Sequence, residues 1–380
     1  MSRVELYERS SLGRLNWPAT PDGDYARRYL TPFMEHGPRT YIANAHTTLQ
    51  VLKVDDVILP ITPTTFHPAN SYVCSPYTHY VTYGQEEFAA LRNPPLEAAL
   101  RLVFRPLAWY FRRAELDRVV YANNWLLSTN LYSALRAEQV TAALRYLAAA
   151  FPDRAVVFRS LDAEHNAEVY GALRTAGARM VFSRSVYYQD VPSPHVQRRQ
   201  HYRRDLKHFE RTPYTVVDGA DLAPADVPRL LALYNDLYLR KYSTYNPQFT
   251  EAFISLCLQQ RLLVIKAFQR DGRLDALLGY FTRGGLLTPP LFGYDTSLPR
   301  ALGLYRLVTT LTALEGQRQG ALVHFSAGVG PFKRARGGVN AIEYNAVYDA
   351  HLPAARRRPW ALLQTLMDRA AIPLIRKYGF

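Results

Sequence analysis

Cysteine and long apolar runs are scarce in this sequence. Only Cys74 and Cys257 occur among 380 residues, so neither a disulfide framework nor a cysteine-rich metal cluster is indicated, and we expect both thiols to be buried. No stretch reaches the roughly 20 apolar residues that a membrane-spanning helix needs, and residues 1–17 lack the apolar core of a secretory signal. We therefore expect a cytoplasmic protein with no membrane span and no metal site.

Several catalytic signatures are also missing. The sequence contains no G-x-x-x-x-G-K-[ST], H-E-x-x-H, C-x-x-C or G-x-S-x-G pattern, which argues against an ATPase, a zinc metalloprotease, a zinc ribbon and an α/β-hydrolase. Negative charge is in short supply, because 32 Asp and Glu face 46 Lys and Arg, for a formal net charge of +14. Such a balance favours an acidic partner: a nucleic acid, a nucleotide cofactor, a phosphorylated carrier or an anionic membrane.

What is present suits two globular domains. Apolar residues make up 48% of the chain and aromatic residues 13%, which is enough for a core in each of two domains at this length. In the first half we expect a strand hairpin at 47–62 turning at Asp55 and Asp56, an aromatic β-rich segment at 71–83, a helix at 96–113 kinked by Pro106, strands at 118–124, 155–161 and 178–191, and helices at 136–150 and 165–176. The proline-marked segment 192–195 predicts a linker, and so domains at 1–192 and 193–380.

The second half repeats the order of the first. We expect helices at 198–211, 227–242, 247–260, 300–317, 332–338 and 357–377, a hairpin at 261–283 turning at Asp271 and Gly272, and strands at 286–295, 321–328 and 341–349. Segments 166–191 and 328–350 also share a plan, in which an aromatic residue, a basic residue and glycine precede a strand rich in Tyr and Val. This predicts a duplication, with two similar α/β units packed together. The alternative is that helix-to-strand segments in general share this order.

The segment FGYDTSLPRALGLYR (292–306) is a candidate phosphate site. A helix that begins here leaves unpaired amide groups at its first turn, and Gly303 lets an anion approach the backbone while Arg300 and Arg306 add charge. With Leu304 and Tyr305, these residues form the predicted cofactor-binding set. The alternative is that Pro299 merely starts the helix and Gly303 packs against the sheet.

Two further groups of residues are candidates. Lys333 follows a glycine-rich segment after a strand, where it could stabilise an oxyanion or hold a phosphate, or could be an ordinary surface lysine. Candidate substrate contacts at strand ends are Tyr77, His79, Asn123, Asn124, Trp125 and Ser326. For these, core tyrosines and satisfied loop amides are the alternative. The basic helix 198–211 could follow a nucleic-acid backbone or be a solvated helix face.

Residues 198–349 resemble the acyltransferase domain of the GNAT superfamily found in FemABX-like and CelD-like proteins. The basic helix, the Asp271–Gly272 hairpin, the FGYD strand end and GPFKRARGG, which is similar to the F-K-x-x-F-G segment of the FemABX group, carry this resemblance. It implies an α/β fold of two GNAT-like domains, each a mixed, mostly antiparallel sheet flanked by helices. In the acyl-CoA loop pattern Q/R-x-x-G-x-G/A, Arg300 and Gly303 fit, whereas Tyr305 replaces a small residue.

The resemblance implies transfer of an acyl group from an activated thioester or ester to the amine of a small molecule or amino acid. By match to the F-K segment, Lys333 takes the oxyanion or phosphate role, and from its position we expect Asp295, with Tyr294 beside it, to accept the amine's proton. We expect no permanently bound cofactor and acyl-CoA as cosubstrate. Aminoacyl-tRNA is the alternative donor, and a non-catalytic module that binds nucleic acid or a carrier is the alternative outside the enzymes.

Overall fold

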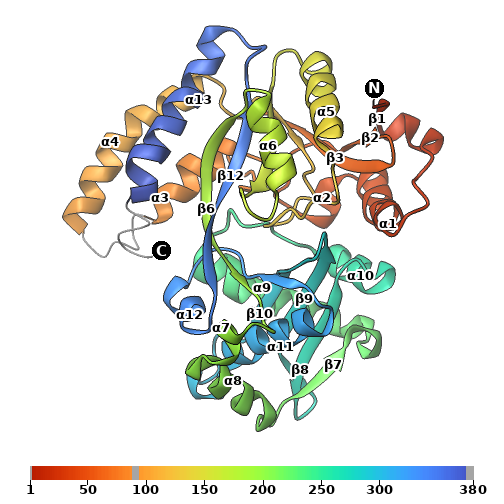
Figure 1. Ribbon diagram of the computed structural model, residues 1–380. Coiled ribbons are helices and arrows are strands. Elements are labelled where there is room, and N and C mark those ends of the chain that lie inside the picture. Colours follow the sequence, from red (N-terminus) through yellow and green to blue (C-terminus); the bar gives the residue numbers. More distant parts are fainter. Residues whose placement is uncertain (1, 88–93, 374–380) are drawn as a thin grey trace.

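The computed structural model describes residues 2–87 and 94–373, and their strands form a single mixed sheet (Figure 1). The strand order is β1-β2-β3-β4-β5-β12-β6-β11-β10-β9-β8-β7. The strands are β1 Val4–Tyr7, β2 Gln50–Val54, β3 Val57–Thr64, β4 Val119–Ala122, β5 Ala155–Leu161, β6 Arg179–Gln189, β7 Thr215–Asp218, β8 Val264–Arg270, β9 Arg273–Arg283, β10 Leu286–Tyr294, β11 Leu322–His324 and β12 Val339–Tyr348.

The strand order shows that the two halves of the chain repeat each other. If each strand of β1–β6 is exchanged with the strand six places later in the chain, the same order results, read from the opposite edge of the sheet. In both units the fourth and fifth strands are parallel, β4 with β5 and β10 with β11, and the other pairs are antiparallel. The first unit contains β1–β6 and the second β7–β12, and the last strand of each unit pairs with strands of the other unit. Strand β12 pairs with β5 and β6, and β6 pairs with β11. The repeated order agrees with the predicted duplication and with the predicted mixed, mostly antiparallel sheet.

Helices cover both faces of the sheet. They are α1 Pro21–His36, α2 Pro38–Tyr41, α3 Tyr83–Glu87, α4 Pro94–Arg113, α5 Ala137–Ala150, α6 Ala167–Thr175, α7 Pro194–Gln197, α8 Gln200–Glu210, α9 Val227–Asn235, α10 Glu251–Gln260, α11 Leu304–Arg318, α12 Gly330–Ala335 and α13 Ala354–Leu366, with π-helical turns η2 Thr78–Thr82, η6 Asp236–Tyr242 and η8 Met367–Ala371. None of the helices in the described ranges is both long and apolar enough to cross a membrane.

The units share their largest apolar core. Leu30 and Phe33 of α1 pack in one cluster with Phe253 of α10 and Leu291 of β10, and the rings of Phe33 and Phe253 meet edge to face at 6.3 Å. In Figure 1 the chain after β11 also returns to the first unit, where α13 lies beside α4. The division at 192 and 193 stays a prediction, since residues on both sides of it build each half of the sheet.

The structure corrects one expected element and adds another. Segment 71–83 was expected to be β-rich, but it contains turns and the π-helical η2. Helix α1, for which no prediction was made, begins at Pro21 after Thr20, whose hydroxyl accepts the amide proton of Gly23 at 3.0 Å. Helix α4 continues on both sides of Pro106. Of the predicted helix 357–377, residues 374–377 lie outside the described residues.

Candidate functional site

The parallel pair β10 and β11 opens along its length. Pairing joins only Leu286 to Leu322 and Leu287 to Val323, although β10 continues to Tyr294. No described strand pairs with that edge of β10 over residues 288–294, so backbone groups inside the sheet are left for another partner, although Pro289 and Pro290 have no N–H to donate. The corresponding pair in the first unit is closed, because β4 pairs with β5 over all of Val119–Ala122. The second unit therefore has the opening.

Aromatic side chains surround this opening. Tyr305 at the start of α11 lies 6.1 Å from Tyr294 and 4.9 Å from Phe332, measured between ring centroids. Tyr238 and Tyr242 extend the group from the π-helical η6, a helix type that recurs at functional sites. These five side chains give the opening a wall that is apolar along the rings and polar at the hydroxyls.

The first turn of α11 has some of the features expected of an anion site and lacks others. Gly303 has φ 66°, a left-handed conformation that favours glycine, and it directly precedes Leu304, the first residue of the helix. Arg300 is exposed, whereas Arg306 is half-buried, 3.8 Å from the Asp205 carboxylate of α8. A Cβ at Gly303 would lie 2.5 Å from His208 Nε2, so the approach to the backbone is narrow. Of the two arginines, Arg300 is the one without an ion pair among the described residues.

Lys333 is a buried lysine, 5% exposed, and not a surface one. Its Nζ donates to the carbonyl oxygens of Phe325 at 2.7 Å, Ser326 at 3.0 Å and Ala327 at 2.8 Å. An ammonium group has three protons, so all of them are used here. Burial, together with the charge of Arg184, lowers the pKa of Lys333 to about 7. In its ammonium form, this lysine holds the loop after β11 and has no proton left for an oxyanion.

The same bonds orient the loop's amides. In a trans peptide the N–H points opposite to the preceding C=O, so carbonyls of 326 and 327 that face Lys333 turn the N–H groups of Ala327 and Gly328 away from it. The Ser326 amide donates to His324 Nδ1 at 3.0 Å. In the described residues, the amides of Ala327 and Gly328 have no acceptor, and both residues are exposed. The loop thus presents two free donors beside the opening.

Asp295 lies in an ion-pair cluster at the end of β10. It accepts hydrogen bonds from Arg229 at 2.8 Å, Arg273 at 2.5 Å and the Ser297 hydroxyl at 2.5 Å. Burial alone would raise the pKa of Asp295, but hydrogen bonds from Ser297 and Arg229 outweigh it and lower the pKa to about 2. A carboxylate with so low a pKa is a weak base, which argues against the expected proton-acceptor role. Its neighbour Tyr294 contacts Lys241 Nζ at 3.4 Å.

The first-half candidates are mostly held by internal hydrogen bonds. Asn124 Nδ2 donates to Thr62 Oγ1 at 2.8 Å, and Asn123 Oδ1 accepts from Trp125 Nε1 at 2.8 Å. Tyr77 packs edge-on against Phe66. These contacts favour the alternative of satisfied loop amides and packed rings for Asn123, Asn124 and Tyr77.

His79 is connected to the second unit. Its Nε2 lies 3.2 Å from Ser183 Oγ, and the adjacent Arg184 donates to Ser326 Oγ at 3.1 Å. Burial, Arg159 and Arg184 lower the pKa of His79 to about 3, so its ring is neutral at neutral pH. Among the predicted residues, His79, Ser326 and Lys333 are therefore brought into one neighbourhood.

A buried charge cluster in this neighbourhood was not predicted. Arg184 of β6 donates to Glu343 of β12 at 2.6 and 2.8 Å, and His324 Nε2 lies 3.0 Å from the same carboxylate. Because His324 Nδ1 accepts the Ser326 amide, its Nε2 carries the proton that it donates to Glu343. Burial would raise the pKa of Glu343, but Arg184 and His324 lower it to about 2. The sequence did contain a signal for this cluster, because Arg184 and Glu343 are oppositely charged residues inside the corresponding, mostly apolar strands of the two repeats.

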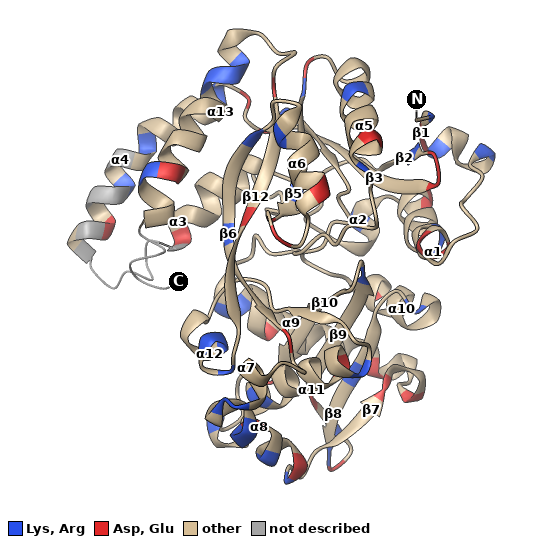
Figure 2. Ribbon diagram, in the orientation of Figure 1, with Lys and Arg blue, Asp and Glu red and all other residues tan. Residues whose placement is uncertain are grey.

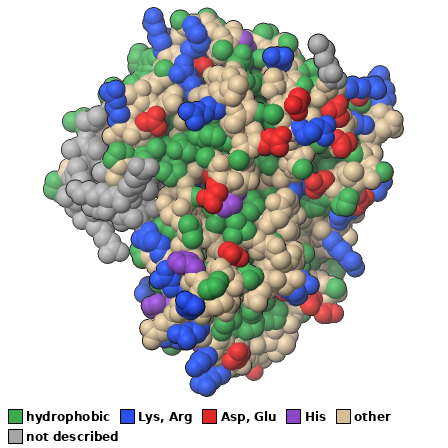
Figure 3. Space-filling view, in the orientation of Figure 1, with side chains coloured by type: hydrophobic (Ala, Val, Ile, Leu, Met, Phe, Trp, Pro, Cys, Tyr) green, Lys and Arg blue, Asp and Glu red, His purple; other side chains and the backbone are tan. Residues whose placement is uncertain are grey.

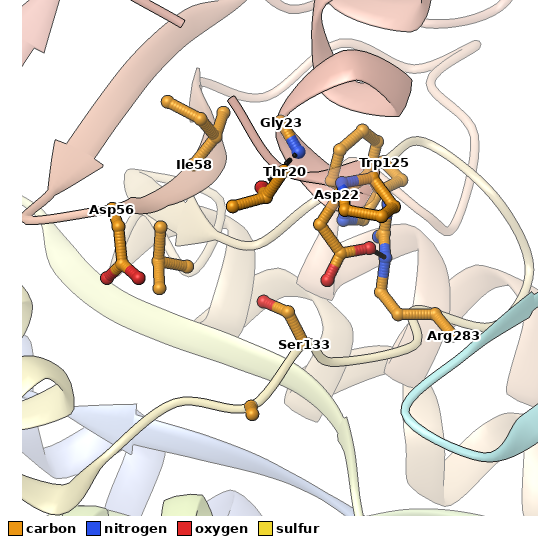
Figure 4. A pocket seen from close by; sticks show the side chains of 11 residues that line it. Thr20, Asp22, Gly23, Asp56, Ile58, Trp125, Ser133 and Arg283 are labelled. Atoms are coloured by element: carbon orange, nitrogen blue, oxygen red, sulfur yellow. Dashed lines mark hydrogen bonds and ion pairs between the residues drawn. The ribbon is translucent and has the colours of Figure 1, made fainter. Parts of the chain in front are cut away.

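A separate cavity of about 350 Å³ lies at the start of α1 (Figure 4). Trp125 lines it together with Asp22, Ile58 and Arg283. The guanidinium of Arg283 lies over the Trp125 ring and bonds Asp22 at 3.2 Å. Arg283 ends β9, opposite the Tyr294 end of β10, so Trp125 faces this cavity and not the opening.

Comparison with known proteins identifies part of the chain. Residues 196–334 match the family model of the acetyltransferase (GNAT) domain. This part of the chain is a GNAT domain. A comparison with curated proteins gave no match. Similar solved structures include L-PGS from Bacillus licheniformis (16% identity, 60% of this chain and 75% of that one, TM-score 0.42), FemX (8%, 56% and 77%, 0.44) and a GCN5-related N-acetyltransferase from Kribbella flavida (15%, 62% and 83%, 0.33). The GNAT domain contains the β10–β11 opening, α11 and Lys333.

Proposed function

We propose that this acyltransferase moves an acyl group from acyl-CoA, or a similar activated thioester, to the amine of a small molecule or amino acid. The observation that carries the proposal is the unpaired edge of β10 over residues 288–294. A donor arm that contains amide groups can hydrogen-bond to this edge as a strand would, with its acyl carbonyl near the loop after β11. Acyl-CoA has such an arm.

In the proposed reaction, the backbone of the loop after β11 stabilises negative charge. The amine nitrogen forms a bond to the acyl carbon, and the bond from that carbon to the donor sulfur breaks. The amine loses a proton to water at the opening, and the leaving thiolate takes up a proton from water, so that the products are an amide and a free thiol. The carbonyl oxygen becomes negative during attack, and the free amides of Ala327 and Gly328 are suited to stabilise it. Lys333 then acts as a positioning residue, because its three bonds fix the direction of those amides.

The amine acceptor reaches the carbonyl from the first unit in this proposal. Arg184 connects Ser326 to the neighbourhood of His79. Among the described residues of β6, Arg184 is the one that hydrogen-bonds to Ser326 Oγ. The Ser326 hydroxyl accepts from Arg184, so its own proton remains available to a polar acceptor. Acyl-CoA is a cytoplasmic metabolite, and we place the protein in the cytoplasm accordingly.

The donor site can be tested with CoA itself. Arg300 is exposed and makes no ion pair in the described residues, so Arg300→Glu should leave the fold intact while repelling the phosphates. We expect CoA to raise the melting temperature of the wild type, and the variant to lose most of that rise. Arg145→Glu, the same charge change at an exposed position of α5, should keep the rise. A full CoA-dependent rise in Arg300→Glu would move the phosphates away from α11.

An aminoacyl-tRNA donor is the second candidate, and the outer face of α8 favours it. Basic side chains are exposed along the segment that includes α7 and α8. Figure 3 shows Lys, Arg and His side chains gathered over this lower-left part of the molecule, and Figure 2 shows the Lys and Arg positions in blue on the ribbon of α8. The exposed members are His195, Arg198, Arg199, His201, Arg203, Arg204, Lys207 and Arg211. Such a face suits a phosphate backbone.

The tRNA proposal predicts a defined salt response. Changing Arg203, Arg204 and Lys207 together to Gln should weaken tRNA binding and reduce the slope of log affinity against log salt by about 2–3, because each lost phosphate contact removes roughly 0.7–0.9. The CoA-dependent rise in melting temperature should not change in this triple variant. Wild-type protein that binds no tRNA at moderate salt would exclude this donor.

A further inference from the structure

The two most exposed large apolar side chains among the described residues lie on one helix. Leu102 is 68% exposed and Trp109 is 66% exposed, and both belong to α4. They are seven residues apart, which is two helical turns and about 10.5 Å, so they lie on the same face of the helix. Solvated single apolar residues are common, but two on one stripe of one helix indicate a contact surface.

The opposite face of α4 accounts for its folding. Phe104, Leu107, Ala108 and Phe111, at spacings of three and four, belong to the apolar cluster that also contains Trp360 of α13. This inner face anchors α4 to the first unit, beside α13 in Figure 1. The helix therefore needs neither Leu102 nor Trp109 for its packing, and the outer stripe is available to a partner.

The outer stripe is also basic. Arg105 is exposed between Leu102 and Trp109, and Arg113 follows Trp109 by one turn, with its guanidinium 6.0 Å from the Trp109 ring centroid. Arg101 and Arg112 flank the stripe and are exposed too, and Arg101 pairs with the Glu97 carboxylate at 2.9 Å. Residues 98–113 contain these arginines and no Asp or Glu. Apolar and cationic groups thus share one face, and the nearby Glu97 carboxylate is bound to Arg101.

We propose that the Leu102–Trp109 stripe of α4 binds the surface of an anionic membrane. Trp and Leu suit insertion at the boundary between headgroups and acyl chains, while arginines extend their stems along that boundary and pair with lipid phosphates. A nucleic acid would use the arginines and Trp109 but gives Leu102 nothing to bury against. The proposal is independent of the acyl-transfer reaction and of the donor.

Vesicle sedimentation tests the proposal. Full-length protein should bind phosphatidylglycerol vesicles at least tenfold more tightly than phosphatidylcholine vesicles, and added salt should weaken the binding. The double variant Leu102→Ser with Trp109→Ser should bind anionic vesicles at least tenfold more weakly, and Arg105→Glu with Arg113→Glu should do the same. Val264→Ser, at an exposed apolar position on β8, is the matched control and should bind as the wild type does.

Fluorescence shows whether the stripe itself enters the lipid. Tryptophan emission should shift to the blue when anionic vesicles are added, and Trp109→Phe should lose most of this shift while it still sediments with the vesicles. Wild-type protein that does not bind anionic vesicles, or variants that bind them unchanged, would overturn the proposal. So would concentration-dependent self-association of the wild type that the Leu102→Ser, Trp109→Ser variant abolishes, since the stripe would then be an interface between two copies.

Discussion

Lys333 and Asp295 show how the surroundings of a single charged residue change the role that its position suggests. Both stand where sequence reasoning placed a catalytic group, next to the opening of the GNAT domain. Lys333 has its three protons on backbone carbonyls, and Asp295 has arginines and a serine on its carboxylate. Each residue therefore holds the structure around the opening, and in the proposed reaction backbone amides and solvent contact the reacting atoms.

Lys333→Met tests the positioning role. Removing Nζ leaves the carbonyls of 325–327 without their donor, and we expect the free energy of unfolding to fall by about 1–3 kcal/mol. Turnover should fall by about a hundredfold, because the Ala327 and Gly328 amides lose their orientation. CoA affinity should stay within a few-fold of the wild type. Urea unfolding, kinetics and CoA titration measure the three effects, and a variant with normal turnover and poor CoA affinity would instead make Lys333 a phosphate ligand.

Glu343→Gln tests the buried charge cluster. The substitution leaves the Arg184 charge buried without a partner, so we expect a loss of about 3–5 kcal/mol in the free energy of unfolding at pH 7. The pKa of Glu343 is lowered to about 2 from an ordinary 4.5, so its contribution is complete above pH 4.5 and is lost as pH falls toward 2. Wild-type stability should fall over that window more steeply than that of the variant.

The matched control for this pair is Glu138→Gln, at an exposed position of α5. It should change neither the urea midpoint at pH 7 nor the acid dependence by a measurable amount. If Glu343→Gln proved as mild as this control, the Arg184 charge would have to be compensated elsewhere in the cluster.

At the scale of elements, local signals predicted what local interactions determine. Asp55 and the pair Asp271–Gly272 have positive φ in the tight turns where hairpins were expected, and β2–β3 and β8–β9 are those hairpins. Segment 71–83 was predicted wrongly because its conformation depends on a distant residue. Asp117 accepts from the Ser75 hydroxyl and the Tyr77 amide, both at 2.6 Å, and so fixes a turn that leads into η2.

Long-range pairing also explains why the candidate site was predicted only in part. The turn before α11 and the glycine-rich loop with Lys333 could be predicted, because each is marked by residues that are close together in the sequence. Arg184 and Glu343 are 159 residues apart, and they meet because β6 and β12 pair in register. Nothing in either strand alone identifies the other as its partner, so the ion pair could not be assigned from the sequence.

Gly293→Ala tests the packing of α9 on β10. A Cβ at this position would lie 2.5 Å from the Leu233 carbonyl carbon and oxygen and 2.7 Å from the Tyr234 amide nitrogen, all backbone atoms that cannot turn aside. We expect a loss of about 3 kcal/mol in the free energy of unfolding. Gly171→Ala in α6 is the control, since nothing lies within 4 Å of its new Cβ. It should stabilise by about 0.5–1 kcal/mol, and equal effects of the two would refute the close contact.

For the whole molecule, the exchange of last strands decides how the halves cooperate. β12 pairs with β6 from Val339 to Val347 and also with β5, while β6 continues to β11. The apolar core shared by α1, α10 and β10 adds a second connection. Two domains linked only by residues 192–195 would unfold independently, whereas strands that complete each other's sheet couple the two units into one transition.

Cleavage of the linker distinguishes these cases. Pro192 is exposed, so a protease site inserted between Pro192 and Ser193 should be cut without unfolding the protein. Because β12 would still lie between β5 and β6, we expect fragments 1–192 and 193–380 to elute together in gel filtration and to melt in a single calorimetric transition. A denaturing gel confirms that the cut is complete. Fragments that separate under native conditions and melt independently would show that the boundary at 192 and 193 divides two self-sufficient domains, and that the paired β6 and β12 contribute little to holding them together.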